Sequence, residues 1–238
     1  MKIALYYAMP GEIASLLEGR DNALLREVAG VKFYQIRENL LAVAGGVGKV
    51  NAAMSTQLLI DLYHPDFIID VGVAGCFENL PIGTLMLPDR FVQYDVDTSA
   101  VGDPVGMVST VNMIHFPVQY MKECRLALQN SGFSCKIGTG ATGEWFATNS
   151  ARAKEIAERF KPLFCEMEGG AIAQVCYRNQ IPFIALKSVS DCLFGNSDYQ
   201  FNFPTAMRDL NSAVLSLIDH LEICLSRDEA SCVYPEQS

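Results

Sequence analysis

Short apolar runs bounded by glycine or proline alternate along this chain with stretches of helical periodicity. Such short runs, rich in β-branched and aromatic residues, are typical of strands buried on both faces of a sheet. The predicted strands are residues 3–8, 40–45, 67–73, 85–87, 164–167 and 183–189. The predicted helices are residues 12–18, 50–63, 118–131, 150–160, 170–178 and 204–225. Their alternation predicts an α/β protein with a mixed, largely parallel sheet covered by helices.

The same pattern shows no internal repeat, low-complexity tract or linker that would mark a domain boundary. A chain of 238 residues with 50% hydrophobic content can bury a large core as one unit. We therefore expect a single domain over residues 1–225. The tail, residues 226–238, loses the helical period and is expected to fray. Residues 94–116 form a long segment without period, and loops of that length are usually functional or mobile.

Composition narrows the class of partner. The chain has 18 Lys+Arg against 27 Asp+Glu, a net charge of -9 that repels a phosphate backbone, so nucleic acid is not an expected partner. No apolar stretch approaches the roughly 20 residues that a membrane-spanning helix requires, so no membrane association is expected. The apolar amino terminus is interrupted by Pro10, Gly11 and Glu12 before a cleavage region appears, which argues against a signal peptide.

Cysteine and histidine placement favours a cytoplasmic protein without a metal. The eight cysteines lack C-x-x-C spacing and lie mostly in apolar or helical patterns, which indicates reduced, buried thiols. The three histidines lie in unlike contexts, so neither a metal site nor a histidine-based triad is predicted.

Acidic residues follow two of the predicted strands, where side chains are better placed to grip a small molecule than to fill a core. Glu166 and Glu168 share one face of an extended backbone, opposite Met167. One of them could cap or pair structurally, but two carboxylates with no cation nearby in sequence also suit hydroxyl binding. Asp191 could simply cap the next segment. Alternatively, Ser190 or a backbone group orients Asp191 to protonate a ligand nitrogen.

Other candidate positions have an equally plain structural interpretation. Glu12 lies in the first turn of a predicted helix, where the helix dipole favours an acid. Residues 45–50 and 70–75 are glycine-rich strand ends that lack the order of a P-loop or a dinucleotide fingerprint. Taken alone each favours a tight turn, although two of them make a shared cleft more plausible. Trp145 and Phe146 could be core aromatics or could stack on a flat ring.

Six short segments combine in order along the chain. They are Ala8-Met9-Pro10-Gly11-Glu12, Gly45-Gly46-Val47-Gly48-Lys49-Val50-Asn51-Ala52, Gly72-Val73-Ala74-Gly75, Thr142-Gly143-Glu144-Trp145-Phe146, Glu166-Met167-Glu168-Gly169-Gly170-Ala171 and Ser190-Asp191. Together they resemble the 5'-methylthioadenosine/S-adenosylhomocysteine nucleosidases, in a match that runs from Met1 to about Leu225. The resemblance implies a three-layer α/β/α fold of the phosphorylase/hydrolase-like group, usually a homodimer, which needs no metal or organic cofactor.

The resemblance also implies roles for individual residues. Glu12 is the general base that activates the attacking water, Asp191 protonates the purine N7, and Lys187 supplies positive charge near the water. The substrate-binding positions are Glu168 and Met167 at the ribose, Phe146 and the backbone of Ala147 at the adenine, Phe201 at the 5'-thioalkyl group, and Ser190, Val73 and Met9. The implied reaction is hydrolysis of methylthioadenosine or adenosylhomocysteine to adenine and a thio-sugar, as in methionine salvage.

The chain departs from the family pattern at several positions. Pro10-Gly11 replaces residues that are often acidic, and Val73 occupies a position that is serine in some members. Lys187 replaces the usual arginine, which keeps the charge but loses the planar fork, so water placement or rate is expected to differ. Residues 94–116 match only at the start, which leaves the 5'-substituent open.

Three alternative functions stay open. Hydrolysis of futalosine or aminofutalosine is a related reaction; Asp191 favours an aminopurine over a 6-oxopurine, but aminofutalosine carries the same adenine. Phosphorolysis is disfavoured because the pattern Gly-Asp-Pro-x-Arg is missing from the first strand end, and Gly102-Asp103-Pro104 lacks the arginine. The third alternative is a nucleoside-binding protein that has lost catalysis.

Overall fold

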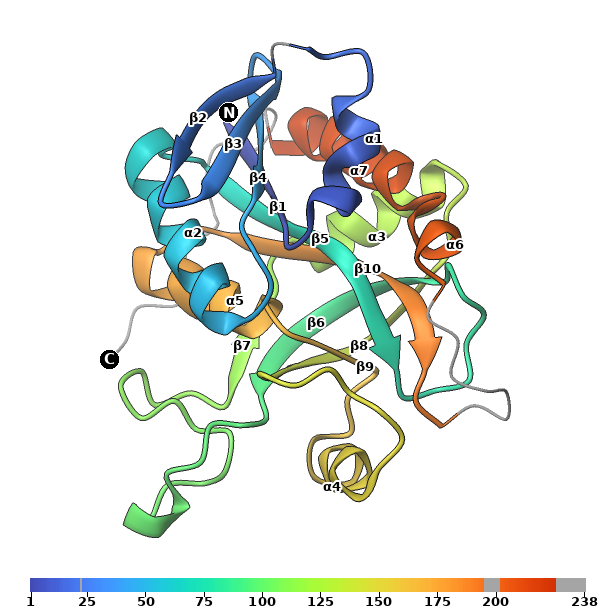
Figure 1. The fold of residues 1–238 in the computed structure, drawn as a ribbon. Coiled ribbons are helices and arrows are strands. Elements are labelled where there is room, and N and C mark those ends of the chain that lie inside the picture. Colours follow the sequence, from blue (N-terminus) through green and yellow to red (C-terminus); the bar gives the residue numbers. More distant parts are fainter. Residues whose placement is uncertain (22, 195–201, 226–238) are drawn as a thin grey trace.

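The computed structural model describes residues 1–21, 23–194 and 202–225, and this part of the chain contains one ten-stranded sheet (Figure 1). The strands are β1 (Ile3–Tyr7), β2 (Leu24–Val28), β3 (Val31–Arg37), β4 (Leu40–Ala44), β5 (Phe67–Cys76), β6 (Leu85–Gln93), β7 (His115–Pro117), β8 (Cys135–Thr142), β9 (Phe164–Glu166) and β10 (Phe183–Cys192). The helices are α1 (Pro10–Leu17), α2 (Lys49–Tyr63), α3 (Met121–Asn130), α4 (Ala151–Phe160), α5 (Gly169–Asn179), α6 (Phe203–Met207) and α7 (Leu210–Leu225). The tail predicted to fray, residues 226–238, lies outside the described residues.

The sheet consists of an open wing and a closed ring of strands. In the wing, β2, β3, β4 and β1 are paired in that order, and β1 also pairs in parallel with β5. From β5 the pairings return to their start, from β5 to β10, β6, β8, β9 and back to β5. Parallel and antiparallel pairs occur together, so the predicted mixed sheet is confirmed. The ring is a feature that the sequence pattern does not indicate.

Helices cover both faces of the wing and its junction with β5 (Figure 1). Along β1, Ala4 and Tyr6 belong to the core under α2 and α5, whereas Ile3, Leu5 and Tyr7 belong to the core under α1, α3 and α7. All five side chains are buried. Because successive residues of a strand point to opposite faces, β1 must be apolar throughout. The three-layer α/β/α architecture expected from the sequence is therefore confirmed.

Four strands, β2, β3, β7 and β8, lack the unbroken apolar run by which the others are predicted. In β3, buried positions are interspersed with more exposed ones. β2 is largely exposed, and β7 has only three residues. In β8 the apolar pattern is interrupted by Gly138 and Gly140. A Cβ on Gly138 would lie 2.7 Å from Leu163 Cβ, and one on Gly140 would lie 2.6 Å from Phe91 Cε1. Glycine in this strand therefore permits close packing, which masks the strand in the sequence.

Three strands run further than predicted. β6 continues to Gln93, six residues beyond its predicted end. The extra residues of β5 and β10 matter for function. β5 continues to Cys76 and β10 to Cys192, three residues beyond each predicted end. The predicted helix over residues 204–225 is two helices, α6 and α7. Residues 94–116 are mostly irregular, as predicted, with a 3-10 turn at Ser99–Val101 and a single bridge between Val108 and Met113. Within the described ranges no helix combines the length and apolar character needed to cross a membrane.

Candidate active site

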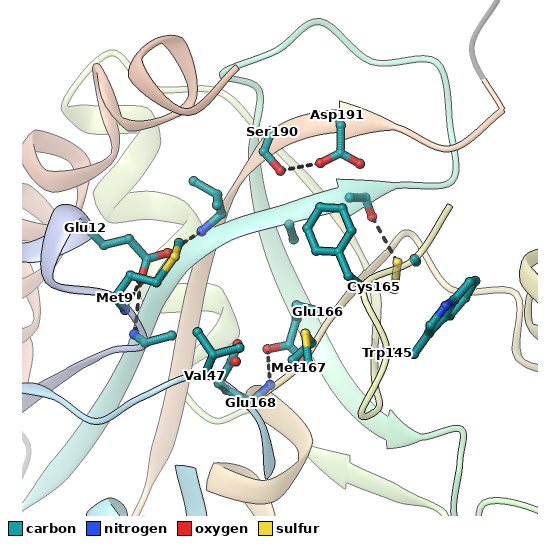
Figure 2. Close-up of a pocket in the computed structure, with 16 residues that line it drawn as sticks. Met9, Glu12, Val47, Trp145, Cys165, Glu166, Met167, Glu168, Ser190 and Asp191 are labelled. Carbon is teal, nitrogen blue, oxygen red and sulfur yellow. Dashed lines mark hydrogen bonds between the residues drawn. The ribbon is translucent and has the colours of Figure 1, made fainter. Parts of the chain in front are cut away.

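A cavity of about 140 Å³ lies at the carboxyl ends of β1, β5 and β10 and beside the amino end of α5 (Figure 2). Its lining residues are Ala8, Met9, Glu12, Val47, Val73, Ala74, Gly75, Trp145, Phe146, Ala147, Cys165, Glu166, Met167, Glu168, Ser190 and Asp191. Figure 2 shows Glu12 and Met9 on one side of the cavity and Trp145 on the other, with Met167 and Glu168 between them. Carboxyl ends of neighbouring parallel strands are where α/β proteins place their ligand sites.

Glu12 is held by backbone N–H groups from two elements. Its Oε2 accepts hydrogen bonds from the N–H groups of Ala8 (3.1 Å) and Met9 (2.9 Å), as expected of an acid in the first turn of a helix. Its Oε1 accepts from the N–H of Val73 in β5 (3.1 Å), which a helix-capping role does not explain. Burial raises the pKa of Glu12, and the charge of Lys187 and these N–H groups oppose this only in part. A fixed carboxylate of raised basicity suits a general base.

Lys187 lies behind the cavity rather than in its lining, and its ammonium is buried among acids. Its Nζ donates to Asp70 Oδ1 at 2.8 Å and lies 3.5 Å from Glu166 Oε2. Burial alone would lower the pKa of Lys187, but the carboxyl groups of Asp70, Glu166 and Glu168 outweigh burial and raise it. Lys187 is therefore a cation, as its predicted role near the water requires.

Glu166, the last residue of β9, and Glu168, at the start of α5, both line the cavity but have different hydrogen-bond partners. Glu166 Oε2 accepts from the N–H groups of Glu168 (3.0 Å) and Gly169 (2.7 Å), and its Oε1 accepts from the hydroxyl of Thr142. Glu166 thus caps α5. Glu168 accepts from the N–H of Gly48 at 2.8 Å, and burial followed by the charge of Glu166 raises the pKa of Glu168 to about 8. Glu166 therefore takes the structural alternative, whereas hydroxyl binding by Glu168 stays a prediction.

Asp191 owes its orientation to an irregularity in β10. The pairing with β5 passes from Val189 to Asp191, so Ser190 is the extra residue of a β-bulge. Ser190 Oγ donates to Asp191 Oδ1 at 2.6 Å, and both residues are nearly fully buried and line the cavity. Ser190 therefore orients Asp191, which is the arrangement that the functional interpretation of Ser190-Asp191 requires. A Cβ on the paired Gly75 would lie 2.8 Å from Asp191 Oδ2, so glycine is needed there.

The segment that follows β8 supplies an aromatic wall. Phe146 is 55% exposed and lines the cavity beside the buried Ala147. Trp145 also lines the cavity, but the guanidinium of Arg152 lies 4.8 Å from its ring centroid, so part of this indole packs against the protein. An exposed phenyl ring that lines a cavity can stack on a flat ligand.

Both glycine-rich strand ends combine close packing with a contribution to the site. At the first, a Cβ on Gly45 would lie 2.2 Å from Tyr6 Cε2, so the tight turn is a packing requirement. In the same turn, Gly48, at φ 95°, directs its N–H to Glu168. At the second, a Cβ on Gly72 would lie 2.8 Å from Glu12 Oε1. The two segments thus meet at one cleft.

Most predicted site residues converge, and the remaining ones are placed as follows. Phe201 lies outside the described residues, and Lys187 stands behind the lining. The sequence pattern does not single out Asp70, Val47 or Cys165 as site residues. Val47 and Cys165 are ordinary apolar positions in the sequence. Asp70 does give a signal, because it is a charged residue inside an apolar strand. No group of three histidine, cysteine or acidic side chains in the described ranges is arranged to hold a metal ion.

Comparison with known proteins agrees with this geometry. The Phosphorylase superfamily profile matches residues 2–220. The 5'-methylthioadenosine/S-adenosylhomocysteine nucleosidase of Shewanella loihica is 33% identical over 230 residues, covering 93% of this chain and all of that protein. The solved structure of such a nucleosidase from Colwellia psychrerythraea in complex with adenine has a TM-score of 0.84 at 29% identity, covering 93% of this chain and 96% of that one. Futalosine hydrolase of Helicobacter pylori has a TM-score of 0.83 at 25% identity, covering 93% and 98%. The chain belongs to the Phosphorylase superfamily and, within it, to the family of 5'-methylthioadenosine/S-adenosylhomocysteine nucleosidases.

Proposed function

We propose that this protein hydrolyses the N-glycosidic bond of 5'-methylthioadenosine and S-adenosylhomocysteine, releasing adenine and the 5-thioribose product. It is an N-glycosidic bond hydrolase that acts on purine nucleosides, as the nucleosidase relatives indicate. The observation that carries the proposal is that Glu12, Glu168 and Asp191, from three separate elements, all line one cavity. Each is nearly fully buried, so a bound nucleoside would meet all three away from bulk water.

Asp191 is proposed as the acid that assists departure of the base. An N-glycosidic bond breaks through an oxocarbenium-like sugar, so the transition state is favoured when the leaving purine is neutralised. Protonation of adenine N7 by Asp191 supplies this, and Ser190 fixes the carboxyl group through its 2.6 Å hydrogen bond. Ser190 is thereby a positioning residue for the acid.

Glu12 is proposed as the base that accepts a proton from the attacking water. Its two oxygens are already tied to three N–H groups, so the carboxylate needs little reorganisation during the reaction. Lys187 contributes positive charge behind this water. Because an ammonium is a point charge rather than a planar fork, it can stabilise the carboxylates without fixing the water in two directions.

The remaining lining residues are proposed to bind the substrate. Glu168 holds the ribose hydroxyls beside Met167, and Phe146 stacks on adenine while the backbone of Ala147 contacts its edge. Met9 and Val73 border the sugar, and Phe201 is proposed for the 5'-thioalkyl group. The apolar character of Met9, Val73 and Met167 suits a thioether-bearing sugar better than a phosphorylated one.

The wider setting follows from the family and from the sequence. We propose a single domain over residues 1–225 in a cytoplasmic homodimer that takes part in methionine salvage and uses no metal or organic cofactor. Size-exclusion chromatography with light scattering measures the oligomeric state, and activity in the presence of a chelator tests the metal independence.

Product analysis tests the main proposal. The protein is incubated with methylthioadenosine or adenosylhomocysteine in phosphate-free buffer, and adenine is measured by chromatography. Release of adenine without phosphate is the expected result. Release only after phosphate is added would reassign the protein to phosphorolysis, and tight binding of an adenine nucleoside without turnover would reassign it to a binding protein.

A second candidate substrate is aminofutalosine. The similarity to Helicobacter pylori futalosine hydrolase, at nearly the same TM-score as the Colwellia nucleosidase, supports its inclusion. Both substrates present adenine to Asp191, so only the 5' side of the cavity distinguishes them. Competition between methylthioadenosine and aminofutalosine, followed through the two sugar products, measures the ratio of kcat/KM directly.

A further inference from the structure

One buried cluster, partly in the cavity lining and partly behind it, holds more acidic than basic groups. It consists of Glu12, Asp70, Glu166, Glu168 and Lys187, with relative exposures between 1% and 8%. Four carboxyl groups therefore share a single ammonium in a region of low dielectric. Unpaired buried charge is costly, so the position of that ammonium decides which carboxylates are stabilised.

The ammonium of Lys187 is held on the Asp70 side of this cluster. Its shortest contact is with Asp70 Oδ1 at 2.8 Å, whereas Glu166 Oε2 lies at 3.5 Å. Neither Glu12 nor Glu168 has a hydrogen bond from Lys187 among the described residues. Glu12 nevertheless feels the positive charge, because Lys187 is the main influence that lowers its pKa.

The register of the sheet explains why the three groups meet. Lys187 in β10 pairs with Gly72 in β5, so Lys187, Gly72 and Asp70 share one face of the sheet. Gly72 has no side chain, and a Cβ there would lie 2.8 Å from Glu12 Oε1 and 3.5 Å from Lys187 Nζ. The gap over Gly72 is the place where Glu12 and the ammonium approach one another, and Asp70 is the next side chain along the same strand.

Asp70 is poorly explained as a stabilising core residue. It is 1% exposed, it does not line the cavity, and its Oδ2 has no hydrogen-bond partner among the residues that the structure describes. Buried ion pairs commonly contribute little net stability compared with well-packed apolar side chains. A carboxyl group with an unsatisfied oxygen beside an active-site cation is therefore better explained by what it does to that cation.

We propose that Asp70 is a positioning residue for the hydrolytic reaction, which anchors the Lys187 ammonium away from Glu12 and so preserves the basicity of the Glu12 carboxylate. This inference rests on the proposed function, because it assigns Asp70 a part in activating the attacking water. In the absence of the Asp70 charge, the ammonium is free to pair with Glu12, Glu166 or Glu168.

The groups that face Glu12 set the expected direction of change. They are Tyr6 and Tyr7 of β1, Asp70 of β5 and Lys187 of β10, together with Glu166 of β9 and Glu168 at the start of α5, which line the same cavity as Glu12. Neutralising Asp70 removes one negative charge from this set. The positive charge of Lys187 is then divided among fewer carboxylates. Both changes favour ionised Glu12 and therefore lower its pKa. The weaker base then removes a proton from water less effectively.

The test is a double-mutant cycle on the full chain with the substitutions Asp70→Asn, Lys187→Met and both together. Asparagine keeps the shape of Asp70 and an acceptor oxygen for Lys187 but not the charge. The double variant removes both charges at once and so avoids an unpaired buried ammonium. Asp219→Asn is the matched control, because Asp219 is an exposed aspartate that pairs with Arg37 at 2.9 Å and does not line the cavity. Thermal melts and the pH dependence of kcat/KM are measured for each protein.

In Asp70→Asn, kcat is expected to fall about tenfold while KM changes by less than about threefold, and the acidic limb of the pH profile is expected to move down by about one unit. In the Lys187→Met background, the same substitution is expected to change kcat by less than about twofold, because Asp70 acts through Lys187. Asp219→Asn is expected to behave as wild type.

Two outcomes would overturn the inference, and a third would refute the proposed function on which it rests. An Asp70→Asn variant with a lower melting temperature but an unmoved pH limb and kcat would show a purely structural role. An equal loss of kcat in the wild-type and Lys187→Met backgrounds would show that Asp70 does not act through Lys187. If Asp70→Asn alone does not fold, a loss of about tenfold in kcat between Lys187→Met and the double variant would overturn the inference in the same way. A wild-type protein that releases no adenine would instead refute the proposed function, which the same measurements distinguish.

Discussion

Replacing Glu12 by glutamine separates the chemistry of this residue from its contribution to the fold. The amide oxygen can accept the hydrogen bonds from Ala8 and Met9, but the amide nitrogen then faces the N–H of Val73, which is also a donor. One hydrogen bond to a charged group is lost, which costs about 1.5–3 kcal/mol. Glutamine also carries no charge that burial penalises, so the two effects oppose each other. We expect the free energy of unfolding at pH 7 to fall by no more than about 3 kcal/mol.

The pH dependence of this difference follows from the raised pKa. Burial raises the pKa of folded Glu12 above the ordinary value of 4.5. Between those two values the folded protein binds more protons than the unfolded chain, so this group makes the wild type less stable as pH rises through the interval. The Glu12→Gln variant lacks this titration. The free energy of unfolding of the wild type minus that of the variant is therefore expected to fall as pH increases from 4.5 to the raised pKa of Glu12.

Activity should respond far more strongly than stability. Loss of a general base typically costs about 10²–10⁴-fold in rate, which corresponds to about 3–5 kcal/mol of transition-state stabilisation. Because Glu12 is proposed to contact the water rather than the nucleoside, KM should change little while kcat falls. Adenine release in phosphate-free buffer gives both constants, and denaturant unfolding at several pH values gives the stabilities.

The matched control is Glu155→Gln, since Glu155 is an exposed glutamate paired with Arg159 at 3.2 Å in α4. This variant should keep wild-type kcat. A folded Glu12→Gln protein with kcat within about threefold of wild type would refute the assignment of Glu12 as the base. A free energy of unfolding of the wild type that rises with pH relative to that of Glu12→Gln would refute the inferred direction of the pKa shift.

Three further results are expected. Asp191→Asn should lower kcat for adenine release by about 10²-fold or more with the fold retained, since asparagine cannot supply the proton to N7. A variant that keeps the wild-type kcat in steady-state assays would show that Asp191 is not the acid. Phe146→Ala should raise KM, or the Kd of adenine measured by calorimetry, with little change in melting temperature, because Phe146 is 55% exposed and contributes little to the core. An unchanged KM and Kd would argue against stacking. Gly45→Ala should destabilise the protein by about 1–3 kcal/mol in denaturant unfolding, because its Cβ would lie 2.2 Å from Tyr6 Cε2. Unaltered stability would show that the turn accommodates the methyl group without strain.

The elements that the sequence predicts are those whose burial is uniform along the strand or follows one face of a helix. β1, β4 and the start of β10 are buried on both faces, and their unbroken apolar runs predict them as strands. β8 escapes prediction because its glycines serve contacts with Phe91 and Leu163, residues that are distant in sequence. A pattern of neighbouring residues in the sequence does not show that a position must be glycine when the residue that packs against it is distant in the chain.

The candidate site shows the same limit. Glu12, Glu168 and Asp191 stand out because acids follow apolar runs. The different roles of Glu166 and Glu168 depend on whose carboxylate accepts from the N–H groups at the start of α5, which is that of Glu166. Their identical chemistry and spacing of two residues contain no signal that separates them. The bulge that lets Ser190 orient Asp191 depends likewise on its pairing with β5.

By itself, the sequence determined the helices, the buried strands and the acids placed at strand ends, because periodicity and residue type act locally along the chain. Only the tertiary structure decided that β5, β10, β6, β8 and β9 close into a ring and that Lys187 meets Asp70, a residue 117 positions earlier. Pairings across such distances depend on strand register and on gaps such as the one over Gly72. These are properties of two segments packed together, and neither segment carries them alone.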